Sequence, residues 1–282
     1  MKGLILEGGA MRGMFTCGVL DVLMEQGIRF DGAAGISAGA VFGCNYKSMQ
    51  PGRAIRYNLR FCKDPRYGSL LSWIKTGDLY EADFCYRLLP EQLDPFDRDA
   101  FAENPMEFYV GATDIRTGRA VFHRCTNGGE SDLTWMQASA SMPLISRPVE
   151  TRNYLLLDGG ISCPIPYRYM ECAGYHRNLI VLTQPLGFVK KKTSALPLLR
   201  FSMKEYPALI RAMAVRHRLY NRQLEEIAKR EALGQAFVIR PPKPLGISRT
   251  EKSPSELKRV YRIGRETALE KLDELMEFLA QH

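Results

Sequence analysis

The pentapeptide Gly35-Ile36-Ser37-Ala38-Gly39 decides the fold of this chain. A short apolar stretch, residues 30–34, precedes it, and residues 40–46 after it have the composition of a helix. The two glycines of the motif allow the backbone to turn sharply between a strand and a helix. The serine hydroxyl then stands exposed above the N-terminus of that helix. This is the pattern of a nucleophile elbow, and it makes Ser37 the candidate nucleophile.

A second glycine-rich segment, Gly8-Gly9-Ala10-Met11-Arg12-Gly13, lies upstream of the elbow. It follows an apolar run at residues 2–6 and precedes apolar residues at helical spacing over 19–24, which predicts a right-handed βαβ unit. Because the carboxyl ends of parallel strands share one edge of a sheet, we expect this loop to lie beside Ser37. Its successive backbone N–H groups are candidates to bind an oxyanion formed during acyl transfer.

The serine also needs a base, because its hydroxyl is a poor nucleophile near neutral pH. Asp158 directly follows a predicted strand, residues 153–157, and Gly159-Gly160 after it would let another segment approach closely. A tight turn without catalytic role is the alternative interpretation of Asp-Gly-Gly. No histidine stands at a comparable glycine-marked strand end, and His176 is the best placed of the four. They are His123, His176, His217 and His282.

Three segments resemble, in order, the motifs of the patatin-like phospholipases, a family of lipid acyl hydrolases. They are the loop ending in Arg12-Gly13, the Gly-x-Ser-x-Gly pentapeptide and Asp158-Gly159-Gly160. The segment Ala138-Ser139-Ala140-Ser141-Met142-Pro143 is also similar to the family, and the resemblance covers residues 3–185. Two positions depart from the family pattern: Glu7 stands where Asp or Gly is common, and residues 161–164 lack the common Asn.

The resemblance implies a three-layer α/β sandwich with a mainly parallel central sheet. It implies a Ser37–Asp158 dyad without histidine, in which Ser37 attacks, Asp158 is the base and residues 8–13 hold the oxyanion. The implied substrates are lipid esters, as for a phospholipase A, a lysophospholipase or an esterase, with no metal and no cofactor. For Asp158 to act as the base, we expect it to be partly buried, with its carboxylate close to the Ser37 hydroxyl. An acyltransferase would share the acyl-Ser37 intermediate.

Two further functions are compatible with the residues. Gly8, Ala10 and Gly13 after a strand form a variant of the dinucleotide-binding fingerprint, with Asp31 at about the right distance downstream. The second alternative function is that of a lipid- or nucleotide-binding module, which would have a basic C-terminal surface and no hydrolytic activity. Between residues 40 and 104 the sequence predicts helices and loops with many bulky apolar side chains. These side chains either cover the sheet or form an apolar lid or acyl pocket over the serine, which a lipid substrate would require.

Charge is distributed unevenly along the chain, which has a net charge of +8. Residues 1–185 carry 19 basic and 20 acidic side chains, whereas residues 186–282 carry 20 and 11. We therefore expect a hydrolase domain over 1–185 and a basic, mostly helical C-terminal region over 186–282 packed on it. The basic excess favours peripheral contact with an anionic membrane surface. No nucleic-acid-binding motif accompanies it, so we expect no nucleic-acid partner.

Two structural details and a location are also predicted. Residues 178–183 should form the last strand of the main sheet, and Ser253 and Glu256 should form a capping box at the start of the last helix. No apolar run approaches the length of a membrane span, and Glu7 comes too early for a secretory signal. The seven cysteines lack paired spacing, which favours reduced thiols over disulfides or a zinc site. We expect a cytoplasmic protein, in peripheral contact with the inner membrane surface.

Overall fold

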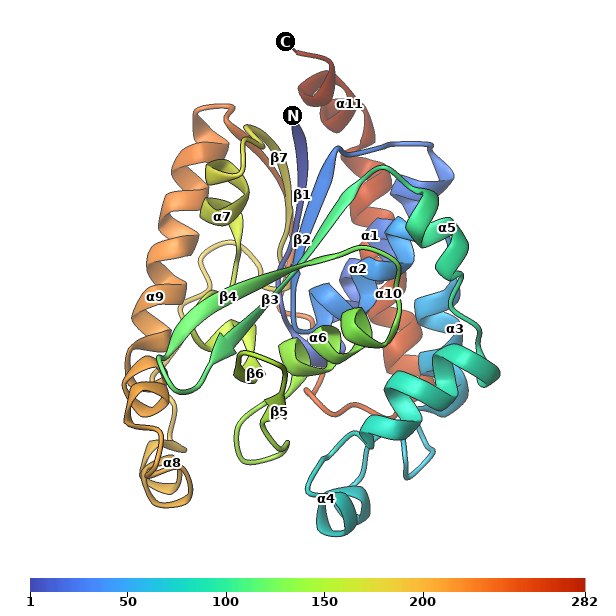
Figure 1. Ribbon diagram of the computed structural model, residues 1–282. Helices are drawn as coiled ribbons and strands as arrows, with labels where there is room; N and C mark the ends of the chain where they lie inside the picture. Colours follow the sequence, from blue (N-terminus) through green and yellow to red (C-terminus); the bar gives the residue numbers. More distant parts are fainter. Residues whose placement is uncertain (282) are drawn as a thin grey trace.

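The computed structural model describes residues 1–281 and has three layers, with one sheet between two layers of helices (Figure 1). The strands are β1 (Lys2–Leu6), β2 (Gly32–Ile36), β3 (Glu107–Asp114), β4 (Arg119–Cys125), β5 (Val149–Glu150), β6 (Leu155–Asp158), β7 (Arg177–Val181) and β8 (Ala236–Ile239). Their order is β5-β6-β3-β2-β1-β7-β8, and β4 also pairs with β3. Neighbours among β1, β2, β3, β7 and β8 pair in parallel. The predicted α/β fold with a mainly parallel sheet is confirmed.

Helices cover both faces of this sheet (Figure 1). One face carries α1 (Gly13–Glu25), α2 (Ala38–Lys47), α3 (Arg53–Phe61) and α10 (Pro254–Glu270), and the other carries α7 (Tyr167–Cys172) and α9 (Pro207–Ala232). The remaining helical segments are η1 (Ala10–Arg12), α4 (Leu70–Thr76), η2 (Phe84–Leu93), α5 (Arg98–Glu103), α6 (Glu130–Ala140), η3 (Gly159–Ile161), α8 (Leu196–Ser202) and α11 (Leu272–Ala280). Because both faces are covered, β1 and β2 are continuous runs of buried residues.

Two strands meet end to end along one edge of β3. Strand β4 pairs antiparallel with residues 108–114 of β3, so the opposite edge of β3 is left for β2 and β6. Parallel β2 occupies that edge as far as the pair Ile36–Gly111. Antiparallel β6 approaches from the other direction and ends at the pair Asp158–Ala112, the next position along β3. The ends of β2 and β6 therefore face each other, and each leads directly into one of the predicted functional residues.

The C-terminal region completes the sheet. Strand β8 pairs in parallel with β7, so the prediction that residues 178–183 form the last strand is wrong. In the same region, α10 crosses α1 at very short range: a Cβ on Gly264 would lie 2.1 Å from the carbonyl oxygen of Phe15. The Tyr261 hydroxyl donates to Asp21 Oδ2 at 2.6 Å across the same interface.

The start of α10 differs in one detail from the sequence prediction. The helix begins at Pro254, but Ser253 makes no side-chain cap hydrogen bond. Its hydroxyl instead pairs with the hydroxyl of Ser255 at 2.8 Å, and Glu256 pairs with Arg259 at 2.7 Å. The predicted capping box is therefore wrong, because both side chains have other partners. Among residues 1–281, no helix is both long enough and apolar enough to cross a membrane.

Candidate active site

Ser37 lies at the turn between β2 and α2, as the pentapeptide predicts. Its backbone angles are φ 54° and ψ −122°, a strained conformation for a residue with a side chain. The surrounding structure holds it there: the Ser37 N–H donates to Ser139 Oγ at 2.8 Å, and the Ser139 hydroxyl donates to the carbonyl of Gly111 at 2.6 Å. Ser139 belongs to the segment 138–143 noted in the sequence, where its positioning contact to Ser37 was not foreseen.

The glycines of the pentapeptide are required by close packing. A Cβ on Gly39 would lie 2.4 Å from the carbonyl oxygen of Leu6, at the end of β1. A Cβ on Gly35 would lie 2.5 Å from the carbonyl oxygen of Gly39. Side chains at these positions would push α2 away from the sheet, and with it the residue at the turn. Gly35 and Gly39 thus let the strand and the helix meet closely around Ser37.

Asp158 ends β6 and lies against Ser37. Its side chain is only 4% exposed, it lines one pocket together with Ser37, and it accepts a hydrogen bond from the N–H of Gly160 at 2.7 Å. Burial raises the pKa of the Asp158 carboxyl above its ordinary value, while the nearby Arg216 cation, the Ser37 hydroxyl and the Gly160 N–H oppose that rise. The carboxylate is therefore a stronger base than a solvated aspartate, and it lies beside Ser37.

The glycine loop passes directly over the serine. A Cβ on Gly8 would lie 2.9 Å from Ser37 Cβ, so a side chain here would fill the space above the hydroxyl. Within residues 1–281, the N–H groups of residues 8–11 donate to no protein acceptor. Gly8, Gly9, Ala10, Met11 and Arg12 all line the pockets around Ser37. Gly13 lines neither pocket and instead packs under Phe42.

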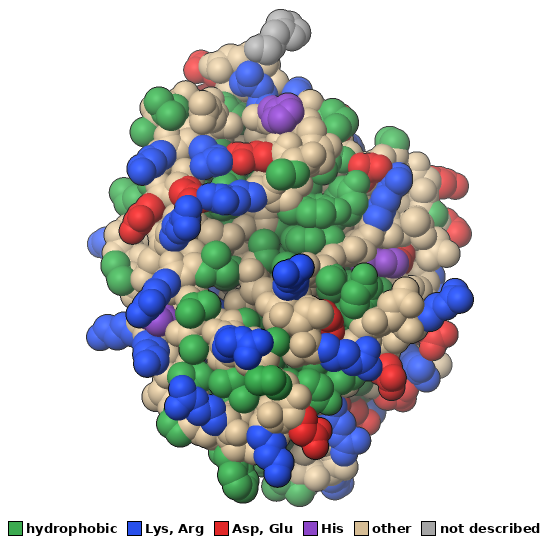
Figure 2. Space-filling view, turned by 60° about the vertical axis from the view of Figure 1, so that its left-hand side comes forward, with side chains coloured by type: hydrophobic (Ala, Val, Ile, Leu, Met, Phe, Trp, Pro, Cys, Tyr) green, Lys and Arg blue, Asp and Glu red, His purple; other side chains and the backbone are tan. Residues whose placement is uncertain are grey.

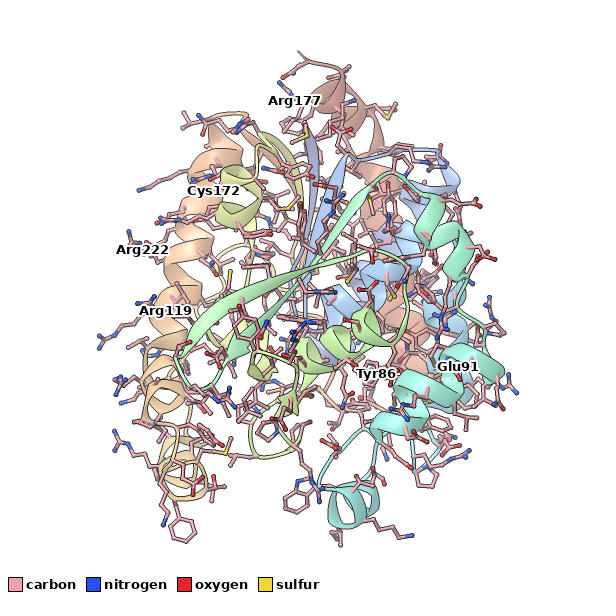
Figure 3. All side chains as sticks on the ribbon, in the orientation of Figure 1. Tyr86, Glu91, Arg119, Cys172, Arg177 and Arg222 are labelled. Atoms are coloured by element: carbon pink, nitrogen blue, oxygen red, sulfur yellow. The ribbon has the colours of Figure 1, made fainter. Side chains whose placement is uncertain are left out.

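Two pockets meet at Ser37. One pocket is apolar and has a volume of about 1160 Å³, which includes the space at its opening to solvent. Residues 40–104 supply much of its wall. Figure 3 shows Tyr86 of η2, one of its lining residues, beside α6. The segment that the sequence described as either a cover or an acyl pocket therefore lines a pocket. The other pocket, about 440 Å³, is polar and is lined by Asp158 and by basic side chains of the C-terminal region, which the sequence did not identify individually.

The histidines are placed elsewhere. His123 pairs with Asp132 at 2.7 Å, His176 lies near Met1 at the opposite edge of the sheet, and His217 lies on α9. Of the part of the chain that the structure describes, no histidine lines either pocket at Ser37. His282 lies outside the described residues. The Asp31 of the dinucleotide interpretation precedes β2, at the end of the strand away from the glycine loop, so the structure does not bring the two together.

One group of side chains could hold a metal ion. His123, Cys125 and Asp132 place ligand atoms within 4.8 Å of one another. The Asp132 carboxylate already accepts hydrogen bonds from His123 and from the backbone N–H groups of residues 126–128. Burial acts to raise the pKa of Asp132, but the hydrogen bonds from His123 and from the backbone outweigh it, so the pKa lies below its ordinary value. These hydrogen bonds account for the closeness of the three side chains, because the Asp132 carboxylate holds the turn at residues 126–128 in place.

Comparison with known protein families supports the resemblance. The model described as patatin-like phospholipase matches residues 4–170, and a model described as a domain of unknown function (DUF6363) matches residues 206–280. The first match spans more than half of the chain. The chain therefore belongs to the patatin-like phospholipase family, and with it to the lipid ester hydrolases.

Individual relatives differ in how much of their length is shared. The Escherichia coli (strain K12) protein YjjU is 28% identical over 275 residues, which span 93% of this chain and 74% of YjjU. Lysophospholipase nte1 of Aspergillus niger is 30% identical over 183 residues, 61% of this chain but only 11% of that protein. Among solved structures, VipD from Legionella pneumophila has a TM-score of 0.48 at 12% identity, covering 97% of this chain and 67% of VipD. This chain thus corresponds to most of YjjU and to a small part of nte1.

Proposed function

We propose that this chain is a serine acyl hydrolase that cleaves lipid carboxylic esters through a Ser37–Asp158 dyad. The observation that carries the proposal is the buried Asp158 carboxylate that shares a pocket with Ser37, at an elbow that the loop of residues 8–11 covers. The resemblance and the family membership support the same chemistry. The apolar pocket beside Ser37 supports a substrate with an acyl chain.

The reaction runs in two halves. Ser37 Oγ attacks the ester carbonyl carbon while its proton passes to the Asp158 carboxylate. The carbonyl oxygen becomes an oxyanion and accepts hydrogen bonds from loop N–H groups, each worth roughly 3 to 4 kcal/mol in other hydrolases. The C–O bond to the alcohol then breaks, and the alcohol leaves with the proton from Asp158. In the second half, water attacks the acyl-Ser37 while its proton passes to Asp158. The bond to Ser37 Oγ then breaks, Asp158 returns the proton to Ser37 Oγ, and the fatty acid is released.

Labelling and hydrolysis test this dyad together. The parent chain, Ser37→Ala, Asp158→Asn and the control Asp31→Asn are treated with a fluorophosphonate probe and with a p-nitrophenyl ester of a short acid. We expect labelling and hydrolysis in the parent and in Asp31→Asn, no labelling of Ser37→Ala, and a loss of at least about a thousandfold in turnover for Asp158→Asn. Undiminished labelling of Ser37→Ala would overturn the mechanism. Loss of activity in Asp31→Asn would show that the losses report a disturbed fold and not the removal of the dyad.

The division of the chain remains part of the proposal: a patatin-like hydrolase domain over residues 1–185, and a basic C-terminal region over 186–282 packed on it. The two family models match on either side of this boundary. We also propose that the protein, acting in the cytoplasm, contacts an anionic membrane surface. Helices α4 and α8 both lie at the end of the molecule where the parallel strands finish (Figure 1). They expose apolar side chains there, with Ile74 69% and Phe201 83% exposed.

Vesicle binding tests the membrane contact. Figure 2 shows Lys and Arg side chains spread among apolar ones over the face that carries α9, and such a surface suits anionic lipid. We expect co-sedimentation with phosphatidylglycerol vesicles that weakens with added salt and is reduced in Phe201→Ser. The control Leu233→Ser, an exposed leucine at the end of α9, should bind like the parent. Equal binding to neutral phosphatidylcholine vesicles would contradict the proposal.

A further inference from the structure

The polar pocket beside Ser37 has an excess of positive charge. Its wall contains four basic side chains, which come from four separate segments of the chain: Arg12, Lys190, Arg216 and Arg249. Only Arg12 belongs to the glycine loop. The other three belong to the C-terminal region, on the loop before α8, on α9 and on the segment before α10. Residues more than two hundred positions apart thus converge on one small space that also contains Ser37 and Asp158.

The two carboxylates of the pocket are already engaged. Glu7 accepts from the N–H of Thr183 at 2.6 Å, and from the hydroxyl of Tyr220 at 2.6 Å. Asp158 accepts from the N–H of Gly160 at 2.7 Å and lies beside Ser37. These bonds explain the unusual Glu7 noted in the sequence: it ties the glycine loop to β7 and α9. Neither carboxylate lies within ion-pairing distance of a basic side chain of the pocket.

The basic groups interact with the two carboxylates only at longer range, Arg12 with Glu7 and Arg216 with Asp158. Across residues 1–281, none of the four forms a salt bridge. Arg12 Nε is buried and has no hydrogen-bond partner. Arg216 donates through Nε to the carbonyl of Gly160 at 2.5 Å, and the Lys190 ammonium lies 4.3 Å from the centre of the Tyr220 ring. Arg12, Lys190 and Arg216 are half-buried and Arg249 is exposed. Positive charge that is partly removed from water without an ion-pair partner is unfavourable, so the pocket favours an anion.

Titration behaviour agrees with this geometry. Burial lowers the pKa of Arg12 and Arg216; Glu7 opposes this for Arg12 and Asp158 opposes it for Arg216, while the charge of Arg249 lowers both further. Burial lowers the pKa of Lys190 to about 8, with Arg216, Arg12 and Arg249 acting in the same direction and Glu7 in the opposite one. The positive charges of the four groups therefore repel one another, and a bound anion would reduce this repulsion.

We propose that this pocket is a head-group subsite that binds a phosphate-type anion on the alcohol side of the ester, and that it selects net-anionic lipid esters over zwitterionic and neutral ones. The proposal rests on the proposed hydrolase function. Ser37, Ala10 and Met142 line both pockets, so the reacting serine stands where the apolar and the cationic spaces join. An acyl chain in the first pocket places the alcohol group toward the second. We name the four basic residues the cationic subsite.

Substrates with one acyl chain and different head groups test the subsite. Palmitoyl lysophosphatidylglycerol, lysophosphatidylcholine and monopalmitoylglycerol are presented in neutral detergent micelles, which removes bilayer binding from the comparison. The measured quantity is the ratio of kcat/KM on the anionic substrate to kcat/KM on monopalmitoylglycerol. We expect the parent to prefer the anionic substrate, and we expect Lys190→Gln and Arg249→Gln each to lower the ratio about tenfold through KM. Lys190→Arg should restore it, and the exposed control Lys191→Gln should leave it unchanged.

The outcomes separate this proposal from the hydrolase itself. Equal use of anionic and neutral esters, with a ratio unchanged in both Gln variants, overturns the subsite and leaves the hydrolase standing. If no ester is hydrolysed, the binding of lysophosphatidylglycerol is measured by calorimetry in the parent and in a variant that combines Lys190→Gln with Arg249→Gln. Binding that is lost in this double variant supports the subsite, and unchanged binding overturns it. Inorganic phosphate is added as a competitor to test whether the pocket binds a free anion. If phosphate competes with monopalmitoylglycerol but the anionic lipid is not preferred, the pocket binds free anion and the head-group assignment is wrong.

Discussion

The two pockets that meet at Ser37 differ in chemistry and in origin. The apolar pocket is lined only by residues between Ala10 and Ser146, all within the segment that matches the patatin-like phospholipase model. The polar pocket takes Lys190, Arg216 and Arg249 from beyond that segment. This difference shows that the segment matching the family model forms the apolar pocket by itself, whereas the polar pocket is completed by residues of the C-terminal region. Changes to one region should therefore alter one half of the substrate preference and spare the other.

Filling the apolar pocket should have the largest effect. Val41 lies on α2 and lines this pocket. Val41→Phe should shorten the accepted chain by several methylenes, and because each buried CH2 contributes about 0.8 kcal/mol, kcat/KM on a palmitoyl ester should fall about a hundredfold. Hydrolysis of a butyryl ester should change little, and so should the preference for anionic head groups. Val215→Phe, an exposed valine on α9, is the control. An equal loss on butyryl and palmitoyl esters would show that the pocket does not hold the acyl chain.

Loosening the contact between α10 and α1 should have the next largest effect. Gly264→Ala places a Cβ 2.1 Å from the Phe15 carbonyl oxygen, so the two helices must move apart. We expect a net loss of about 2 kcal/mol in the free energy of unfolding, about thirtyfold in the unfolding constant, despite the better helix propensity of Ala. Denaturant unfolding measures it. Lys258→Ala, on the exposed face of α10, should change stability by less than about 0.5 kcal/mol. A stability of Gly264→Ala equal to that of the parent would mean that α10 does not hold the C-terminal region in place.

Alkaline pH should weaken only the cationic side. The pKa of Lys190 is lowered to about 8, chiefly by burial, so the side chain is charged below that pH and neutral above it. The preference for lysophosphatidylglycerol over monopalmitoylglycerol should be highest below pH 8 and should fall up to about tenfold as pH rises through 8. Arg12, Arg216 and Arg249 face the same pocket and stay charged. Lys190→Arg should keep the preference constant across this range, and the same decline in that variant would assign the titration to another group.

Short motifs explain what the sequence could predict. The turn at Ser37, the loop at Gly8 and the strand end at Asp158 each depend on a few adjacent residues, so their local signals survive in the sequence. The cationic subsite has no such signal, because its members are brought together only by the packing of α9 and the C-terminal segment. Ser139 was inside a noted segment, but its hydrogen bond to Ser37 spans 102 positions. The prediction that residues 178–183 form the last strand failed for a similar reason, because the sequence of the four-residue strand β8 does not indicate which strand it pairs with.

The meeting of β2 and β6 along β3 has a consequence for how the site tolerates change. Asp158 reaches Ser37 because its strand pairs with β3 in one particular register, with no direct chain connection between the two residues. Since side chains alternate between the faces of a sheet, removal of a single residue from 155–157 would turn this carboxylate to the opposite face. The connection between β4 and β6 supports the same geometry, because the N–H of Ser37 donates to Ser139 Oγ, the N–H of Asp158 donates to the Ser141 carbonyl, and β5 pairs with β6. The site therefore depends on the length of a four-residue strand.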